Sequence, residues 1–177
     1  MVSKFMKILP IKDKELFLRY AIPCGRVLVK RGELEKGLLE RLGSSVKTGK
    51  EIEIPVENVF RVATSMCSII AKRTGKNEID AEVIRRYFLL EHEKAIKWRQ
   101  QIRPELKVSE CLVYPGRVIK IDSQGIIVKT KLGEKTFRGD FIERLQKNDW
   151  VSVHYDYISE KIKASYANKI LSRERYE

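Results

Sequence analysis

Cysteine and histidine are scarce in this sequence, and their scarcity argues against several classes of protein. The 177 residues include three cysteines, an odd and widely spaced set that forms no disulfide framework and that we expect to be reduced. There are only two histidines, and CxxC, HExxH and zinc-finger spacings are absent, so neither a tight metal motif nor a catalytic triad can be assembled. G-x-G-x-x-G and Walker loops are also absent, which argues against those nucleotide sites. We therefore predict that the chain is not an enzyme by itself.

Long hydrophobic runs are missing as well. No apolar stretch is long enough to cross a bilayer. The opening residues MVSKFMKILPIKDKE lack the apolar region and small-residue cleavage site of a secretory signal. These absences predict a cytoplasmic protein that does not act at a membrane.

Charge is plentiful, with a formal net charge of +12. A basic excess favours nucleic-acid binding, because Lys and Arg neutralise phosphates and release counterions. The basic residues alternate with glutamates, however, as in RGELEKGLLERLG, which is typical of a solvated helix face. Nucleic-acid binding is therefore an alternative function, with Arg117, Lys129 and Lys131 as its candidate residues. A metal-free interaction module is a further alternative.

The apolar pattern before Pro104 is helical. Helices are predicted at residues 13–22, 31–43, 55–75 and 80–104. Pro23 and Gly43 are expected to end the first two, with Cys24 in the loop after Pro23. Polar residues 44–54 are predicted to be a loop.

Two predicted helices carry apolar stripes. Cys67 lies on the stripe of residues 55–75, where a buried cysteine packs as a small hydrophobe. The helix of residues 80–104 has Asp80 as its expected N-cap. Its stripe consists of Ile84, Tyr87, Phe88, Ala95 and Trp98.

After Pro104 the pattern becomes short and alternating, and turn residues interrupt it. Strands are predicted at residues 111–121, 126–131, 135–139 and 150–157, followed by a helix over residues 158–177. Hairpin spacing suggests a meander that closes, or nearly closes, into a small β-barrel of about five strands. The predicted class is therefore α+β, with a helical domain at residues 1–106 and a β-barrel domain with a C-terminal helix at residues 107–177.

Three residues carry candidate chemistry. Cys111 lies at the head of a strand, at an accessible domain edge, where a thiolate could bind a metal and where packing is equally plausible. His154 falls on the polar face of its strand with Ser152 and Asp156, so a solvated surface histidine is its alternative. His92 lies at the edge of an apolar helix face and is interpreted as a core or rim histidine.

The segment from Cys111 to about Ile162 resembles the small hydrogenase-maturation chaperones of the HypC/HupF family. That family opens with a cysteine, aliphatic or small residues, a proline, often a glycine, and then a basic and an aliphatic residue. CLVYPGRV, residues 111–118, is similar. The family also carries a valine–histidine strand that leads to an aliphatic-x-x-lysine-aliphatic ending. VSVHYDYISEKI, residues 151–162, supplies it.

The resemblance implies an OB-like barrel that acts as a non-enzymatic accessory protein in metallocentre assembly. Family members carry or help to load an iron fragment with diatomic ligands, together with an iron–sulfur partner, and some contact the immature large subunit of nickel–iron hydrogenase. The essential cysteine maps to Cys111 and the family histidine to His154, which makes iron the implied metal. Tyr114, Pro115 and Arg117 are the residues predicted to bind a partner protein.

This chain departs from the family pattern in two respects. The family cysteine follows the initiator methionine, whereas Cys111 is internal and has no free amino group beside it. Val113 and Tyr114 also replace residues that are usually smaller or aliphatic. The sequence therefore predicts a fusion in which the preceding helical domain sets the partner.

Overall fold

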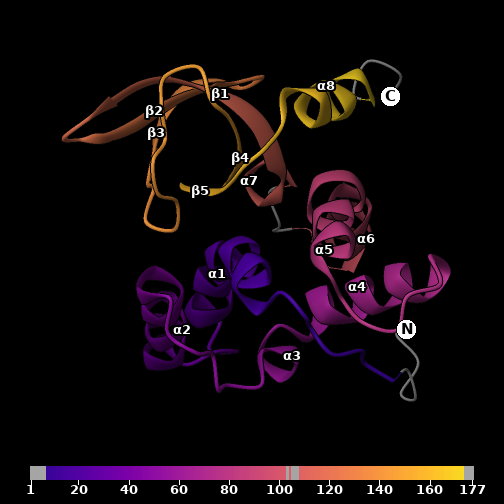
Figure 1. Cartoon of the computed structure of the whole chain (residues 1–177). Coiled ribbons are helices and arrows are strands. Elements are labelled where there is room, and N and C mark those ends of the chain that lie inside the picture. The colour runs from indigo at the N-terminus through magenta and orange to yellow at the C-terminus, as the bar shows by residue number, and fades with distance from the viewer. Residues whose placement is uncertain (1–6, 103, 105–107, 174–177) are drawn as a thin grey trace. The chain divides into compact units, whose positions relative to one another are not determined.

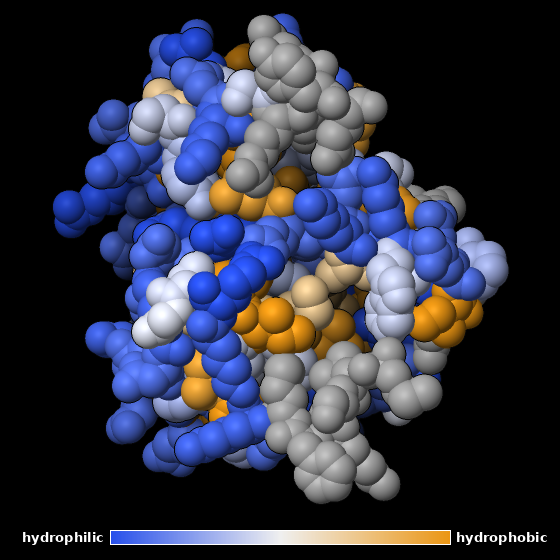
Figure 2. Space-filling view, turned by 90° about the vertical axis from the view of Figure 1, so that its right-hand side faces the viewer, coloured by the Kyte–Doolittle hydropathy of each residue, from blue (hydrophilic) through white to orange (hydrophobic). Residues whose placement is uncertain are grey.

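The computed structural model describes residues 7–102, 104 and 108–173. The chain divides into two compact units, Met1–Phe88 and Leu89–Glu177 (Figure 1). The domain boundary predicted after residue 106 falls among residues 105–107, outside the described residues, and stays a prediction. In the described part of the chain, no helix is long and apolar enough to cross a membrane. Hydrophilic side chains dominate the face shown in Figure 2, with smaller hydrophobic patches between them.

The N-terminal unit is helical, as predicted. Its helices are α1 (Lys14–Lys30), α2 (Lys36–Thr48), α3 (Val56–Val59), α4 (Arg61–Arg73) and α5 (Ala81–Arg86). Aromatic rings form much of its core. The Phe17 ring meets Phe60 and Phe88 edge to face, and Tyr20 stacks on Phe88 with ring centroids 4.9 Å apart.

Helix α1 does not stop at Pro23, so that prediction is wrong, and Cys24 lies within the helix rather than in a loop. A proline inside a helix costs about 3 kcal/mol, because it lacks the N–H and clashes with a carbonyl in the preceding turn. Burial of Tyr20, Ile22 and Pro23 offsets this cost.

Helix α2 continues past Gly43, which was the predicted stop. Leu39, Leu42 and Val46 extend one buried stripe through the segment predicted to be a loop. Gly49, in the left-handed conformation with φ of 63°, lies at the actual C-terminal cap. The single helix predicted over residues 55–75 is interrupted at Phe60, between α3 and α4.

The helix predicted from Asp80 is continuous but irregular. The Asp80 carboxylate accepts a hydrogen bond from the Val83 N–H at 3.0 Å, which confirms the N-cap. A π-helical turn, η1 (Tyr87–Glu91), joins α5 to α6 (His92–Ile102). Such a turn inserts about one residue and rotates the face that follows. The predicted stripe therefore fails at Trp98, which is 51% exposed, while His92 is buried.

The C-terminal unit contains α6, a short helix, α7 (Val108–Cys111), an antiparallel sheet and a C-terminal helix, α8 (Ala164–Arg173). The strands are β1 (Val113–Asp122), β2 (Gly125–Thr130), β3 (Gly133–Phe137), β4 (Trp150–His154) and β5 (Tyr157–Lys161). Within the described residues the sheet has five strands in the order β3-β2-β1-β4-β5. A single bridge between Arg138 and Tyr157 links its two edges, so the sheet is not closed. The α+β class is confirmed, and the barrel stays a proposal.

The core of this unit lies on one face of the curved sheet. Its buried residues are Tyr114, Val118, Val128, Phe137, Val151, Val153 and Ile158. Gly116 allows β1 and β2 to approach closely, because a Cβ at this position would lie 2.4 Å from a Val128 methyl group. Helix α8 packs against β1 and β4.

The strand predicted over residues 150–157 is two strands. It ends at His154, reverses through Tyr155 and Asp156, and returns as β5. Residues 158–161 are therefore strand rather than helix, and α8 begins only at Ala164. The turn contains no glycine or asparagine, the usual signals, and Tyr155 itself adopts the left-handed conformation with φ of 55°.

Candidate functional site: a buried cysteine and histidine beside an open pocket

Cys111 ends α7, two residues before β1, and its side chain is buried rather than accessible at an edge. The burial overturns the expected exposure. The thiol lies 2.9 Å from the Tyr155 hydroxyl, within hydrogen-bonding distance, and either group can donate. Tyr155 is held in place by the tight turn between β4 and β5. The turn thus brings a phenol to the thiol from 44 residues further along the chain.

His154 is the last residue of β4 and is completely buried, so the solvated alternative is wrong. Its Nε2 atom lies 3.1 Å from the backbone carbonyl oxygen of Cys111. A carbonyl oxygen only accepts hydrogen bonds, so Nε2 must carry the proton in this contact. If the ring is neutral, Nδ1 carries the lone pair and is the nitrogen through which the ring could bind a metal. The structure therefore places the ring of one predicted metal ligand, His154, against the backbone of the other, Cys111.

A third residue of this cluster, His92, was not predicted to belong to the site. Its ring meets the His154 ring edge to face, with centroids 5.5 Å apart. Burial, and then the proximity of His154, lower the pKa of His92 to about 3, so it is neutral at pH 7. The sequence did predict a core or rim position for His92. It contained only one weak hint of the pairing, namely that these are the only two histidines in the chain.

The described residues hold no group of three or more histidine, cysteine, aspartate or glutamate side chains that could bind a metal ion. Cys111 and His154 are thus a pair of potential ligands rather than a complete protein site. Any metal at this pair would need ligands from elsewhere.

The residues predicted to bind a partner differ in exposure. Tyr114 and Pro115 are buried, and the Tyr114 hydroxyl donates a hydrogen bond to the Ser109 carbonyl at 3.0 Å. Arg117 is exposed, and its guanidinium lies 6.0 Å from the centroid of the Trp150 ring. Of these three residues, Arg117 is the one directly available to a partner.

The residues proposed for nucleic-acid binding fall at two places. Lys129 lies directly opposite Arg117 across β1 and β2, so their side chains share one face of the sheet. Lys131 is at the tip of the β2–β3 hairpin, and its Nζ atom lies 5.2 Å from the centroid of the Tyr114 ring. Tyr114 belongs to the core, on the face of the sheet opposite to Arg117 and Lys129. Arg117 and Lys129 therefore form a basic pair on one face of the sheet, whereas Lys131 lies apart from them, against the Tyr114 ring.

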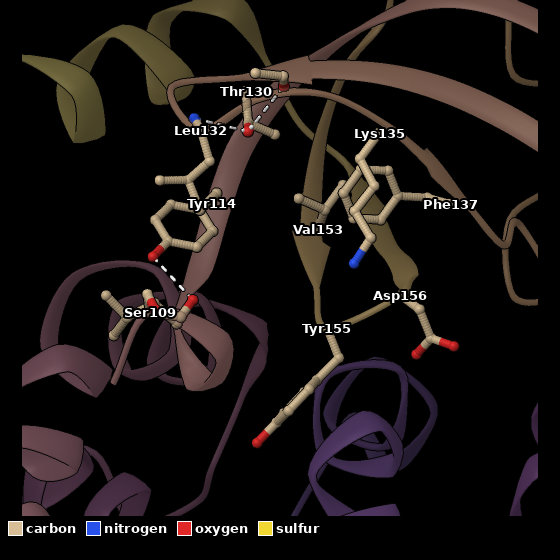
Figure 3. Close-up of a pocket in the computed structure, with 11 residues that line it drawn as sticks. Ser109, Tyr114, Thr130, Leu132, Lys135, Phe137, Val153, Tyr155 and Asp156 are labelled. Atoms are coloured by element: carbon tan, nitrogen blue, oxygen red, sulfur yellow. Dashed lines mark hydrogen bonds between the residues drawn. The ribbon is translucent and has the colours of Figure 1, made fainter. Parts of the chain in front are cut away.

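A pocket of about 410 Å³ opens on the core face of the sheet (Figure 3). Its lining combines apolar and aromatic side chains with polar ones, and Lys135 and Asp156 are its charged residues. Val153 lines it, whereas the next residue, His154, points to the opposite face of β4. The lining residues are Ser109, Leu112, Tyr114, Thr130, Leu132, Gly133, Lys135, Phe137, Val153, Tyr155 and Asp156. The pocket and the cysteine–histidine pair are therefore separate features that share Tyr155.

These features define a small open β-sheet domain with a C-terminal helix and a buried cysteine–histidine pair at one end. The model of the HupF/HypC family matches residues 111–173, beginning at Cys111. This match confirms the resemblance of the C-terminal part and indicates a role like that of a hydrogenase-maturation chaperone. No curated protein and no solved structure gives a significant match to the chain.

Proposed function

We propose that this chain is a non-enzymatic accessory protein of metallocentre assembly, which binds a partner protein in the cytoplasm and handles iron through Cys111. The observation that carries the proposal is the contact between His154 and the Cys111 backbone, within a segment that matches the HupF/HypC family. A thiolate and an imidazole are ligands that suit iron(II).

Iron would be cargo in this function rather than a resident cofactor. Cys111 and His154 offer one sulfur and one nitrogen, and the described residues add no third ligand of these kinds. The remaining ligands would come from the cargo's own diatomic groups or from the partner. Incomplete ligation suits a carrier, because a partly coordinated metal can be passed on. The thiol would have to lose its proton on binding, and the Tyr155 hydroxyl could then act only as the donor in their contact.

Metal content after anaerobic purification tests this proposal. The wild-type protein, supplied with iron, is expected to carry near-stoichiometric iron, and Cys111→Ala is expected to lose it. Cys24→Ala is the matched control, because Cys24 is a cysteine on α1 in the other unit. Iron absent from the wild-type protein, or retained in Cys111→Ala, would contradict the proposal.

Nucleic-acid binding is the second candidate function, and one observation favours it. Arg117 faces Lys129 on β2 and Trp150 on β4, so two cations and an indole ring form a row across the sheet. Cations that neutralise phosphates beside an aromatic surface are typical of single-strand binding. Its test is the salt dependence of binding to single-stranded RNA.

A further inference from the structure

The outer edge of β3 is open for most of its length. Strand β3 pairs with β2 on one side and ends the sheet on the other. Just beyond the strand, the Arg138 N–H donates to the Asp156 carbonyl at 2.8 Å, and the Arg138 carbonyl accepts from the Ile158 N–H at 2.9 Å. Arg138 is thus the point at which the edge is closed by the turn before β5.

The backbone groups that precede this point can be assigned from the ladder. Thr130 and Gly133 are the closing pair of the two-residue β2–β3 turn, so their backbone groups face each other. Hydrogen-bonded and outward-facing residues alternate along an antiparallel edge strand. Glu134 and Thr136 therefore direct their N–H and C=O groups away from β2, in the same sense as Arg138. Both residues are exposed.

The pocket lies directly beside this edge. Gly133, Lys135 and Phe137, the alternate residues of β3, line one side of it. Tyr155 and Asp156, in the turn between β4 and β5, also line it (Figure 3). A strand added to β3 at Glu134 and Thr136 would place every second side chain over the pocket.

We propose that the β3 edge and this pocket bind an extended segment of a partner protein by strand addition. The segment would place an apolar side chain against Leu112, Phe137 and Val153, which are walls of the pocket. Acidic residues would flank that side chain, because the β2–β3 hairpin carries Lys129, Lys131 and Lys135 against the single Glu134. This inference deepens the proposed partner binding but uses neither Cys111 nor iron.

A pair of substitutions at Thr136 isolates strand addition from other contacts. Thr136→Pro removes the outward N–H without breaking a bond to β2, which is the setting in which edge strands tolerate proline. Thr136→Val keeps the N–H and also the methyl group that lies near Gly125. Thermal unfolding of both variants establishes that they are folded before any binding is compared.

The probe is a display library of seven-residue peptides selected on the metal-free, full-length protein. We expect the selected peptides to combine an apolar central residue with acidic neighbours. They should bind Thr136→Val like the wild type and Thr136→Pro at least about tenfold more weakly. Lys135→Glu should also weaken their binding. If Thr136→Pro does not fold, selected peptides resynthesised with N-methyl groups on the amides facing β3 should lose binding to the wild type by the same factor.

The inference would be overturned by the absence of any binder in the library, by equal binding to Thr136→Pro, or by an equal loss of binding in Thr136→Val. Self-association of the wild-type chain that Thr136→Pro abolishes would also overturn it, since the occupant would then be a second copy. The selected peptides should still bind Cys111→Ala, which is the variant expected to lose iron. The peptide experiment and the iron experiment can therefore fail independently of each other.

Discussion

Tyr155 is the residue that links the features of the C-terminal unit. Its hydroxyl contacts the Cys111 thiol, its ring centroid lies 5.0 Å from that of His154, and its side chain lines the pocket. A non-glycine residue in the left-handed region costs about 1 kcal/mol or more. The surrounding contacts hold Tyr155 in place despite this cost.

Removal of the Tyr155 hydroxyl should expose the chemistry of Cys111. In Tyr155→Phe we expect alkylation of Cys111 by iodoacetamide to accelerate by about threefold or more, because a hydrogen bond of about 1 kcal/mol that holds the thiol is lost. Peptide mass spectrometry after timed quenching measures each cysteine separately. Tyr157→Phe is the matched control, since Tyr157 packs on Phe141.

Cys67 serves as an internal reference in the same samples. It is fully buried, and burial raises the pKa of its thiol, so it should stay unmodified in every folded variant. An unchanged Cys111 rate in Tyr155→Phe, with Cys67 protected throughout, would show that the hydroxyl does not hold the thiol.

Of the four residues in this cluster, the sequence indicated Cys111 and His154 as site residues and missed Tyr155 and His92. Cys111 and His154 were found because a family motif brackets them. Tyr155 was interpreted as a strand residue, because Asp156 is the one turn-favouring residue in the turn and is a weak signal by itself. His92 was placed in a core, but its contact with His154 joins residues 62 positions apart, which helical periodicity cannot reveal.

The elements show where local pattern and tertiary packing disagree. Helical periodicity correctly predicted a helix in each of the regions that hold α1, α2, α3 with α4, and α5 with α6, although residues 31–35 precede α2 and are not helical. The ends were less accurate, because buried stripes carry α1 through Pro23 and α2 through Gly43. In the sheet, β1, β2 and β3 were predicted with small errors, whereas β5 was absorbed into a predicted helix.

Two glycines of α2 offer a paired test of these boundaries. Gly43→Ala should stabilise the protein by about 0.5–1 kcal/mol, because the position is helical and a Cβ there meets nothing within 4 Å. Gly49→Ala should destabilise it by about 1 kcal/mol, since its φ of 63° disfavours a side chain. Urea denaturation of both variants gives the two signs, and destabilisation by Gly43→Ala would place the end of α2 at residue 43.

The whole molecule combines a helical unit that the family model does not match with a C-terminal unit that it matches from Cys111. That the chain is a fusion, and that its helical unit selects the partner, both stay predictions. The net charge of +12 is a property of the whole molecule, because basic residues are spread over both units.

The accessory-protein account predicts that binding to single-stranded RNA is weak and non-specific. The affinity for RNA should fall steeply as the salt concentration rises. The double variant Arg117→Glu with Lys129→Glu should lose no more affinity than Lys36→Glu with Lys50→Glu, two exposed positions in the other unit. Fluorescence anisotropy at several salt concentrations measures the RNA affinity of both double variants. A clearly larger loss and a smaller salt slope for the Arg117 and Lys129 pair would favour the nucleic-acid function instead.

The most direct test of the central claim is the iron K-edge X-ray absorption spectrum of the protein loaded with iron(II) under anaerobic conditions. If Cys111 is an iron ligand, the spectrum will contain a sulfur neighbour in the first coordination shell, and Cys111→Ala will show only nitrogen and oxygen neighbours. A wild-type spectrum without sulfur, or a sulfur neighbour that persists in Cys111→Ala, would contradict the assignment of the thiol as the group that holds iron.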